Sequence, residues 1–157
     1  MKPRVYVETT IVSYLVARPS RDVVLKAHQQ LTHDWWTEER PRYDLCVSPL
    51  VVREASAGDA RMAGLRLSAL HDVPLLEITS DATELARTLI ERGSLPSKAE
   101  ADALHIALAA VHGVEFLLTW NCKHIANARM RPRIETLCRA AGYSPPILCT
   151  PEELTGT

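Results

Sequence analysis

The chain has 157 residues, a length that suits one domain with its own hydrophobic core, and we expect residues 1–157 to form a single domain. Hydrophobic residues make up 46% and charged residues 24% of the sequence, which argues against an intrinsically disordered chain. The net charge is −1 and the pI is about 6.6, unlike a strongly basic nucleic-acid binder. Any contact with nucleic acid must therefore depend on a local patch or on a metal ion.

The first third of the chain predicts two strands separated by helices. Residues 5–7 are β-branched and aromatic, which predicts a buried strand that stops at Glu8. Helical spacing follows over residues 11–17, and Ser20 is the expected N-cap of a long helix that reaches Glu39. Residues 45–47 predict the second strand. The apolar stripe expected for the long helix consists of Val23, Val24, Ala27, Leu31 and Trp35.

The middle of the chain predicts three helices and one more strand. Ser48 and Pro49 are an N-cap and first-turn pair for a helix that carries Glu54 and ends near Gly58. A further helix is expected over residues 60–70, and a third strand over residues 75–78. Ser80 then opens a helix that ends at Gly93.

The last third begins with the clearest local signal. Ser97 followed by Glu100 three residues later is a capping box, and the helix behind it should end at Gly113. We expect a fourth strand over residues 115–119, a helix over 131–141, a last strand over 147–149 and a short helix from residue 150. Strands that alternate with helices predict an α/β fold, with a mostly parallel sheet covered on both faces.

Cysteine spacing and the N-terminal sequence indicate in which cellular compartment the protein is expected. The four cysteines form no CxxC pair, which argues against a structural zinc site and favours reduced core thiols. They are Cys46, Cys122, Cys138 and Cys149. Arg4 and Glu8 interrupt the N-terminal apolar stretch, so no signal peptide is visible, and no apolar run reaches the roughly 18 residues of a membrane span. We therefore expect a cytoplasmic protein without a membrane segment.

Polar residues gather near the predicted carboxyl edge of the sheet, where sites of parallel sheets lie. Glu8 ends the first strand, Asn121 follows the fourth, and Asp102 lies early in the helix that leads into the fourth. Glu54 lies in the helix after the second strand. Carboxylates hold Mg²⁺ or Mn²⁺, which can activate a water and offset the charge of a phosphate. We predict that the three acids converge to hold a divalent metal against a nucleic-acid phosphate.

Each of these residues also has a purely structural interpretation. Glu8 could cap the next helix, Glu54 could be a solvated helix residue, and Asn121 could simply make a turn. Asp102 stands among small residues that pack closely, and a buried acid needs a partner. His105 is a candidate for an orienting role, as is His124. The histidine spacing does not fit a zinc hydrolase, and the sequence contains no glycine-rich phosphate loop.

Four segments together resemble PIN-domain proteins, and among them the VapC-type toxins of bacterial toxin–antitoxin pairs. These segments are residues 5–11, 48–54, 102–107 and 118–125. The resemblance implies a three-layer α/β/α sandwich and an endoribonuclease that depends on Mg²⁺ or Mn²⁺. It also implies a homodimer that is held by an antitoxin protein.

The resemblance gives metal-ligand roles to Glu8, Glu54 and Asp102, and Asn121 matches the fourth position of the catalytic site. Substrate contacts are expected from Thr9, Thr10, Thr119, Lys123 and His124. Residues 129–133, which are rich in arginine, could lie near the RNA backbone. The family's first acid is usually Asp, and its fourth position is often Asp. The departures at Glu8 and Asn121 favour one metal ion over two.

Two other interpretations of the sequence stay open. A PIN domain that has lost its activity would bind a partner or RNA without cutting it, and Glu8 and Asn121 favour this alternative. An unrelated α/β hydrolase or phosphotransfer domain would share the fold class, but the sequence holds no motif that matches one.

Overall fold

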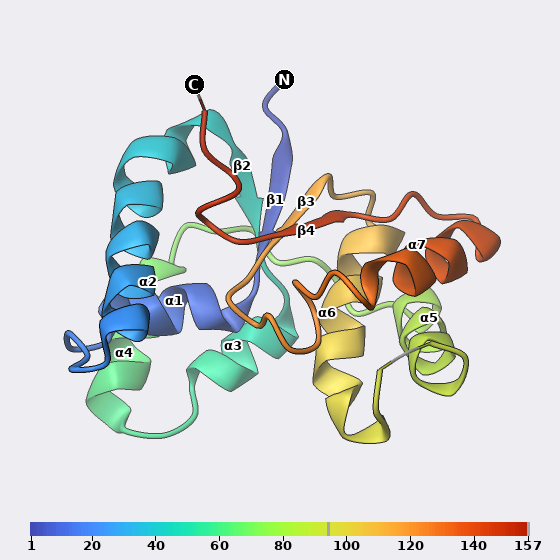
Figure 1. The fold of residues 1–157 in the computed structure, drawn as a ribbon, viewed down its shortest axis with the longest axis horizontal. Coiled ribbons are helices and arrows are strands. Elements are labelled where there is room, and N and C mark those ends of the chain that lie inside the picture. Colours follow the sequence, from blue (N-terminus) through green and yellow to red (C-terminus); the bar gives the residue numbers. More distant parts are fainter. Residues whose placement is uncertain (94, 157) are drawn as a thin grey trace.

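A parallel sheet forms the centre of the molecule (Figure 1). The structure is a computed structural model that describes residues 1–93 and 95–156, and within these residues the sheet has four strands. They are β1 (Arg4–Val7), β2 (Asp44–Cys46), β3 (Phe116–Leu118) and β4 (Ile147–Cys149). Their order in the sheet is β2-β1-β3-β4, and all neighbours are parallel.

Helices cover both faces of this sheet. They are α1 (Thr9–Val16), α2 (Val23–Asp34), α3 (Pro49–Ala55), α4 (Ala60–Ala69), α5 (Ser80–Glu91), α6 (Glu100–Val111) and α7 (Arg131–Ala140). Helices α1 to α4 gather on one side of the strands and α5 to α7 on the other (Figure 1). The predicted three-layer α/β/α sandwich is thus confirmed. Among the described residues, no helix is long and apolar enough to cross a membrane.

The hydrophobic core lies around β1 and α6. Val5, Tyr6 and Val7 are each 0% exposed, because β1 is flanked by two strands and covered on both faces. Helix α6 has eight consecutive positions from Ala103 to Ala110 without an exposed side chain, and only Leu104 among them is partly accessible. A helix that is hydrophobic nearly all round must be buried in this way.

The sheet topology has a switch point at the carboxyl ends of β1 and β3, and we use the term crevice for the region outside these two strand ends. The chain leaves β1 toward β2 on one side and leaves β3 toward β4 on the other, so the direction of winding changes between β1 and β3. Ligands of such sheets bind outside this switch point. Val7 pairs with Leu118, and the Glu8 N–H donates to the Leu118 carbonyl at 3.0 Å. Glu8 and Thr119 therefore emerge next to each other at the crevice.

The strand expected over residues 75–78 is reduced to one isolated bridge, between Val47 and Leu75. The Val47 N–H donates to the Pro74 carbonyl at 3.0 Å, and Val47 accepts from the Leu76 N–H at 2.7 Å. Leu76 is buried, whereas Leu75 and Ile78 are 58% and 37% exposed. The run is apolar, but most of it has no hydrophobic neighbour to pack against, so pairing ends after one bridge.

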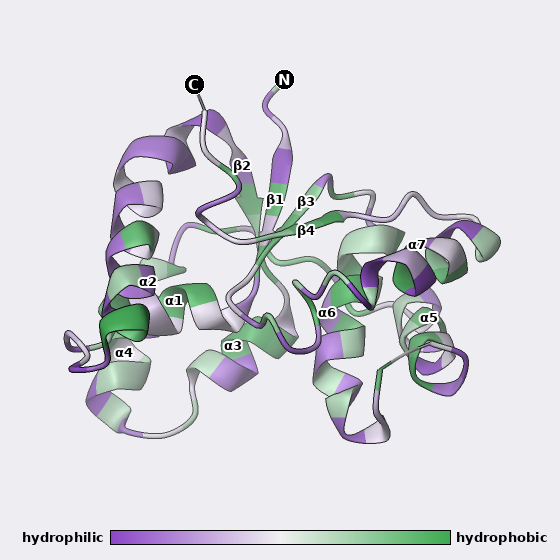
Figure 2. Ribbon diagram, in the orientation of Figure 1, coloured by the Kyte–Doolittle hydropathy of each residue, from purple (hydrophilic) through white to green (hydrophobic). Residues whose placement is uncertain are grey.

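The long helix expected from Ser20 to Glu39 begins later and buries a different face. Asp22 is the N-cap of α2 and accepts from the Leu25 N–H at 2.8 Å. Val23 and Val24 are 81% and 64% exposed, which makes the first turn of α2 hydrophobic on the outside (Figure 2). The helix continues after Asp34 as a π-helical turn over Trp35–Glu39.

The predicted stripe is correct at Leu31 and Trp35 but wrong at Val23, Val24 and Ala27, and polar residues on the inner face of α2 explain the difference. Gln29 and Thr32 are buried at 7% and 0% exposure. The Gln29 side chain accepts from the Ser20 N–H at 2.9 Å, and the Thr32 hydroxyl accepts from the Trp120 indole N–H at 2.7 Å. Because these partners satisfy the polar groups, the buried face need not be apolar.

Two helix starts that the sequence predicts, at Ser97 and at Thr150, are absent from the structure. The Ser97–Glu100 capping box does not form: residues Ser97–Ala99 are a 3₁₀ turn, and α6 begins at Glu100 without a side-chain cap among the described residues. Residues after Thr150 form a turn instead of a helix. The Glu153 carboxylate accepts from the Thr150 N–H at 3.0 Å and thereby closes that turn.

Candidate metal centre

Glu8 lies at the junction of β1 and α1 and is only 4% exposed. It is the N-cap of α1, and its carboxylate accepts from the Thr10 N–H at 3.1 Å and from the Thr10 hydroxyl at 2.5 Å. The Thr119 hydroxyl donates to the same carboxylate at 2.5 Å. Three donors and the helix N-terminus thus stabilise a buried negative charge. The capping interpretation is correct, and it leaves the carboxylate at the crevice.

Glu54 projects from α3 toward α6. Its Oε1 accepts from the Thr9 hydroxyl at 2.6 Å and lies 2.7 Å from His105 Nε2. Burial alone would raise the pKa of Glu54, but the hydrogen bond and charge of His105, together with the Thr9 hydroxyl, outweigh burial and lower it. Glu54 is therefore a carboxylate at neutral pH, the form that binds cations.

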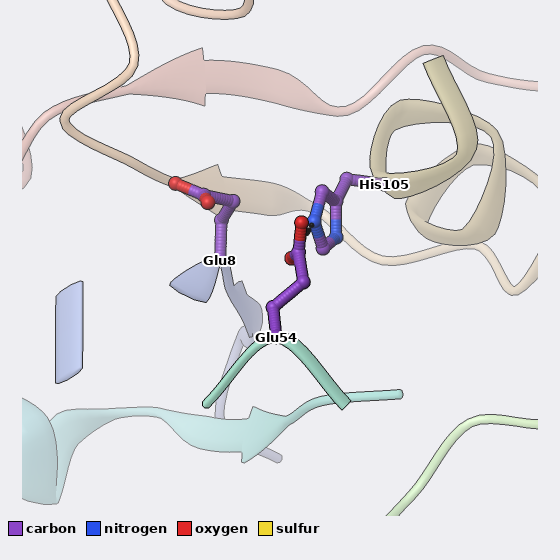
Figure 3. A group of neighbouring side chains, drawn as sticks. All are labelled: Glu8, Glu54 and His105. Atoms are coloured by element: carbon purple, nitrogen blue, oxygen red, sulfur yellow. Dashed lines mark hydrogen bonds and ion pairs between the residues drawn. The ribbon is translucent and has the colours of Figure 1, made fainter. Parts of the chain in front are cut away.

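Glu8, Glu54 and His105 form one group of possible metal ligands (Figure 3). One ligand atom from each residue lies within 4.8 Å of the other two. In Figure 3 the Glu54 carboxylate meets the His105 ring, while the Glu8 carboxylate points away from that pair. The end of β1, helix α3 and helix α6 each supply one residue, so the fold itself assembles the group.

Two buried hydroxyls, those of Tyr6 and Ser48, support His105 on the ring edge that faces away from Glu54. The Tyr6 hydroxyl lies 2.7 Å from His105 Nδ1 and 2.8 Å from the Ser48 hydroxyl. His105 is 1% exposed, and Tyr6 and Ser48 are both 0% exposed. Burial raises the pKa of Tyr6 far above its usual range, so this hydroxyl keeps its proton. The imidazole is thus fixed on both sides, by Tyr6 and by Glu54.

Asp102 lies beside this group but outside it in the part of the chain that the structure describes. Its Oδ1 accepts from the Asn121 amide at 3.0 Å, and its Oδ2 lies 2.8 Å from His124 Nδ1. The Asn121 N–H donates to the Thr119 hydroxyl at 2.9 Å, which itself donates to Glu8. Asp102 is therefore linked to Glu8 through the segment that follows β3.

The residues expected to touch substrate occupy two kinds of position. The hydroxyls of Thr9, Thr10 and Thr119 donate to the two glutamates and so orient their carboxylates. His124 contacts Asp102, whereas Lys123 is exposed in the turn after β3. Contacts of these residues with a substrate stay a prediction.

His105 is the residue that sequence reasoning placed only in an orienting role, although it belongs to the ligand group. Its position three residues after Asp102 puts both side chains on the same face of α6, which was the available signal. Tyr6 went unnoticed, although a hydroxyl inside a fully buried strand needs a hydrogen-bond partner.

The chemistry of these side chains fits a divalent cation. Carboxylates suit Mg²⁺ and Mn²⁺, and imidazole suits transition metals. The Glu54 side chain is 32% exposed, so the group is open to solvent on the side of α3. A phosphate could approach from that side.

Comparisons with known proteins identify the family and the fold of this chain. The family model for the PIN domain matches residues 5–124, a range that contains Glu8, Glu54, Asp102, His105 and Asn121. No curated protein matches the chain. Among solved structures, the chain is similar to one described as VapBC2 from Rickettsia felis bound to a DNA fragment from their promoter. That match has 15% sequence identity and a TM-score of 0.53, and it covers 76% of this chain and 89% of the other.

The structural match shows a shared fold, and the family match covers most of the sequence, from β1 to the turn after β3. The chain therefore belongs to the PIN-domain family.

Proposed function

We propose that this chain is a divalent-metal-dependent endoribonuclease and the toxin of a toxin–antitoxin pair. The observation that carries the proposal is the convergence of Glu8, Glu54 and His105, whose ligand atoms lie within 4.8 Å of one another. They lie at the switch point of the sheet, where α/β proteins bind their ligands. Membership of the PIN family supports the same activity.

In this proposal Glu8, Glu54 and Asp102 hold Mg²⁺ or Mn²⁺ at the crevice. The bound cation would supply an activated water and offset negative charge on the phosphate. Thr9, which donates to Glu54, keeps that carboxylate aimed at the centre. Without a cation, the acids would repel both one another and a polyanionic substrate.

The turn after β3 is the proposed contact with the RNA backbone. Lys123 is exposed there, close to Asp102 through its neighbours Asn121 and His124. An ammonium at this place would pair with a phosphate, so RNA binding should weaken as the salt concentration rises. The chain's net charge of −1 is compatible with such a local contact, because only a few phosphates need to be reached.

An antitoxin protein and a second copy of the chain are the proposed partners. Support comes from the similarity to a structure that contains a VapBC2 complex, together with the family match. Expression of the chain should arrest growth, and co-expression with the product of an adjacent small gene should relieve the arrest. Light scattering should give the mass of two copies; a mass of 17.4 kDa would contradict the homodimer.

The decisive experiment is cleavage of single-stranded RNA in the presence of Mn²⁺. We expect wild-type protein to cut, and both EDTA and Asp102→Asn to abolish cutting. Glu100→Gln is the matched control, because it removes an exposed acid from the same helix outside the group. Equal cleavage by wild type and Asp102→Asn would contradict the assignment of Asp102.

A domain that binds without cutting is the second candidate. It is favoured by the neutral Asn121 at the fourth position and by Glu8, whose carboxylate already has three hydrogen-bond donors. Calorimetry separates the two candidates. Absence of Mn²⁺ binding at millimolar concentration, together with intact RNA or partner binding, would favour the binding domain.

A further inference from the structure

We propose that His105 Nε2 is itself a metal ligand, so that the centre adds one imidazole to the carboxylates of the proposed site and prefers Mn²⁺ or Co²⁺ to Mg²⁺. The inference rests on the proposed function, because it concerns the cation of the same site. The proposed function names only oxygen ligands, whereas this inference adds a nitrogen ligand and a preference among metal ions.

The position of His105 supports this role. The side chain is 1% exposed, yet its Nε2 faces the Glu54 carboxylate at the crevice and not the hydrophobic core. One ring nitrogen of His105 lies within 4.8 Å of ligand atoms from both Glu8 and Glu54, and Nε2 is the nitrogen that faces Glu54 at 2.7 Å. A cation held by these two glutamates would therefore lie next to the imidazole edge.

The other edge of the ring has the partner that a metal-bound histidine requires. Such a histidine usually donates its second ring N–H to a neighbouring acceptor, which fixes the tautomer and the ring plane. The Tyr6 hydroxyl lies 2.7 Å from Nδ1 and contacts the Ser48 hydroxyl at 2.8 Å. Hydroxyls both donate and accept, so the pair can serve either tautomer of the ring.

The two tautomers of His105 differ in which ring nitrogen carries the N–H proton, and only one of them leaves Nε2 free to bind a metal. In one tautomer Nε2–H donates to Glu54 Oε1, and Nδ1 accepts from the Tyr6 hydroxyl; both contacts have hydrogen-bond length. In the other tautomer, which a bound cation would require, the ring proton is on Nδ1 and is donated to the Tyr6 oxygen, while Tyr6 donates to Ser48. Nε2 then has a free electron pair for the metal.

Asp102 and His105 lie on one face of α6 but have different partners. Both oxygens of Asp102 are engaged, one by Asn121 and one by His124. His105, one turn further along α6, is directed at Glu54 instead. Imidazole binds Mn²⁺, Co²⁺ and other transition metals, whereas Mg²⁺ strongly prefers oxygen ligands. A centre that includes His105 should therefore discriminate between these ions.

The test is calorimetry with Mn²⁺ and Mg²⁺ on wild type and His105→Gln. Glutamine is neutral and keeps an N–H that can donate to Glu54. We expect the Kd for Mn²⁺ to rise by at least about 100-fold, the upper end of what loss of an outer partner alone produces. The Kd for Mg²⁺ should change little. An equal change for both ions would overturn the proposal and leave His105 as a positioning residue.

Tyr6→Phe is the companion variant. It removes the partner of Nδ1 while leaving Nε2 in place, so it should weaken Mn²⁺ binding by about 10- to 100-fold and keep the preference over Mg²⁺. Circular dichroism would verify that both variants fold.

A measurement on wild-type protein needs no variant. Pulsed electron paramagnetic resonance of the Mn²⁺-loaded protein should show coupling to one imidazole nitrogen; absence of that coupling would overturn the proposal. Both readouts are independent of RNA. A protein with the nitrogen coupling but without RNA cleavage would contradict only the proposed function, and cleavage without the coupling would contradict only this inference.

Discussion

Two neighbouring groups of side chains occupy the crevice, and they are built differently. Glu8, Glu54 and His105 come from the end of a strand and from two helices, and His105 is backed by the buried hydroxyl of Tyr6. Asp102 instead meets side chains of the turn after β3, Asn121 and His124. Helices and a strand end therefore position the whole first group, whereas two of the three residues in the second lie in a turn.

This difference suggests that the two groups have different roles in the proposed function. Ligands that must hold a cation need fixed geometry, which regular elements and locked rotamers provide. Residues that meet a substrate benefit from a position on a loop supported by a rigid scaffold. We infer that the first group supplies most of the affinity for the metal, with Asp102 as a weaker ligand, and that the turn residues of the second group mainly position the RNA.

The largest effect is expected for Glu54→Gln. The substitution replaces a charged ligand by a neutral one in the first group, while keeping the size of the side chain. The Kd for Mn²⁺ measured by calorimetry should rise by at least about 100-fold, and RNA cleavage should be lost. Glu100→Gln on α6 should behave like wild type. Unchanged Mn²⁺ binding by Glu54→Gln would place the metal elsewhere.

Asp102→Asn should separate binding from cleavage. Because both oxygens of Asp102 are already hydrogen-bonded outside the first group, loss of its charge should raise the Kd for Mn²⁺ by only about tenfold. Cleavage should nevertheless be abolished, because in the proposed function the Asp102 carboxylate helps to hold the cation that activates the water. A loss of Mn²⁺ affinity as large as that of Glu54→Gln would erase the distinction between the groups.

Tyr6 supports the first group and Asn121 the second, and we expect these two residues to contribute differently to the free energy of unfolding. Tyr6→Phe leaves the buried Nδ1 of His105 and the Ser48 hydroxyl without their shared partner, so the free energy of unfolding should fall by about 1–3 kcal/mol. Asn121→Ala acts at a partly exposed turn where water can replace the lost contacts, and it should cost less. Urea unfolding of both variants gives the comparison, and equal losses would contradict it.

The sequence predicted the larger features because they follow from local patterns. Buried strands such as Val5 to Val7 are marked by β-branched and aromatic residues, and parallel topology then brings Glu8 to the carboxyl edge. The first half of the α2 stripe was wrong because apolar periodicity does not register Gln29 and Thr32, whose polar groups find distant partners. Such partners belong to the tertiary structure and leave no mark on neighbouring residues.

The candidate site also depends on tertiary contacts that cannot be predicted from neighbouring residues in the sequence. Glu8 and Glu54 were predicted from their places after strands, but the pairing of Glu54 with His105 depends on how α3 and α6 approach each other across the end of β1. No local pattern encodes that approach. The spacing of Asp102 and His105 on one helix face indicated that both could point to the crevice, without indicating that each would meet a different partner.

The smallest expected effect concerns a cysteine next to the second group. Cys122 follows Asn121 and is exposed, whereas the other three cysteines are buried. Burial raises the pKa of Cys46 and Cys138 to about 11 and that of Cys149 to about 12, so these thiols stay protonated at neutral pH. Burial also raises the pKa of Cys122, but reagents can reach it. Mass spectrometry after maleimide treatment should therefore find one adduct on folded protein and four in urea.

The adduct at Cys122 then probes the second group without a substitution in either group. A bulky group beside Asn121 and Lys123 should hinder the approach of RNA and slow cleavage a few-fold, while the first group stays unchanged and the Kd for Mn²⁺ stays the same. Cys122→Ser protein should be insensitive to the reagent. If the adduct weakened Mn²⁺ binding as much as it slowed cleavage, the turn after β3 would have to be counted as part of the metal centre, because a modification confined to an RNA-positioning segment has no means of lowering affinity for the cation.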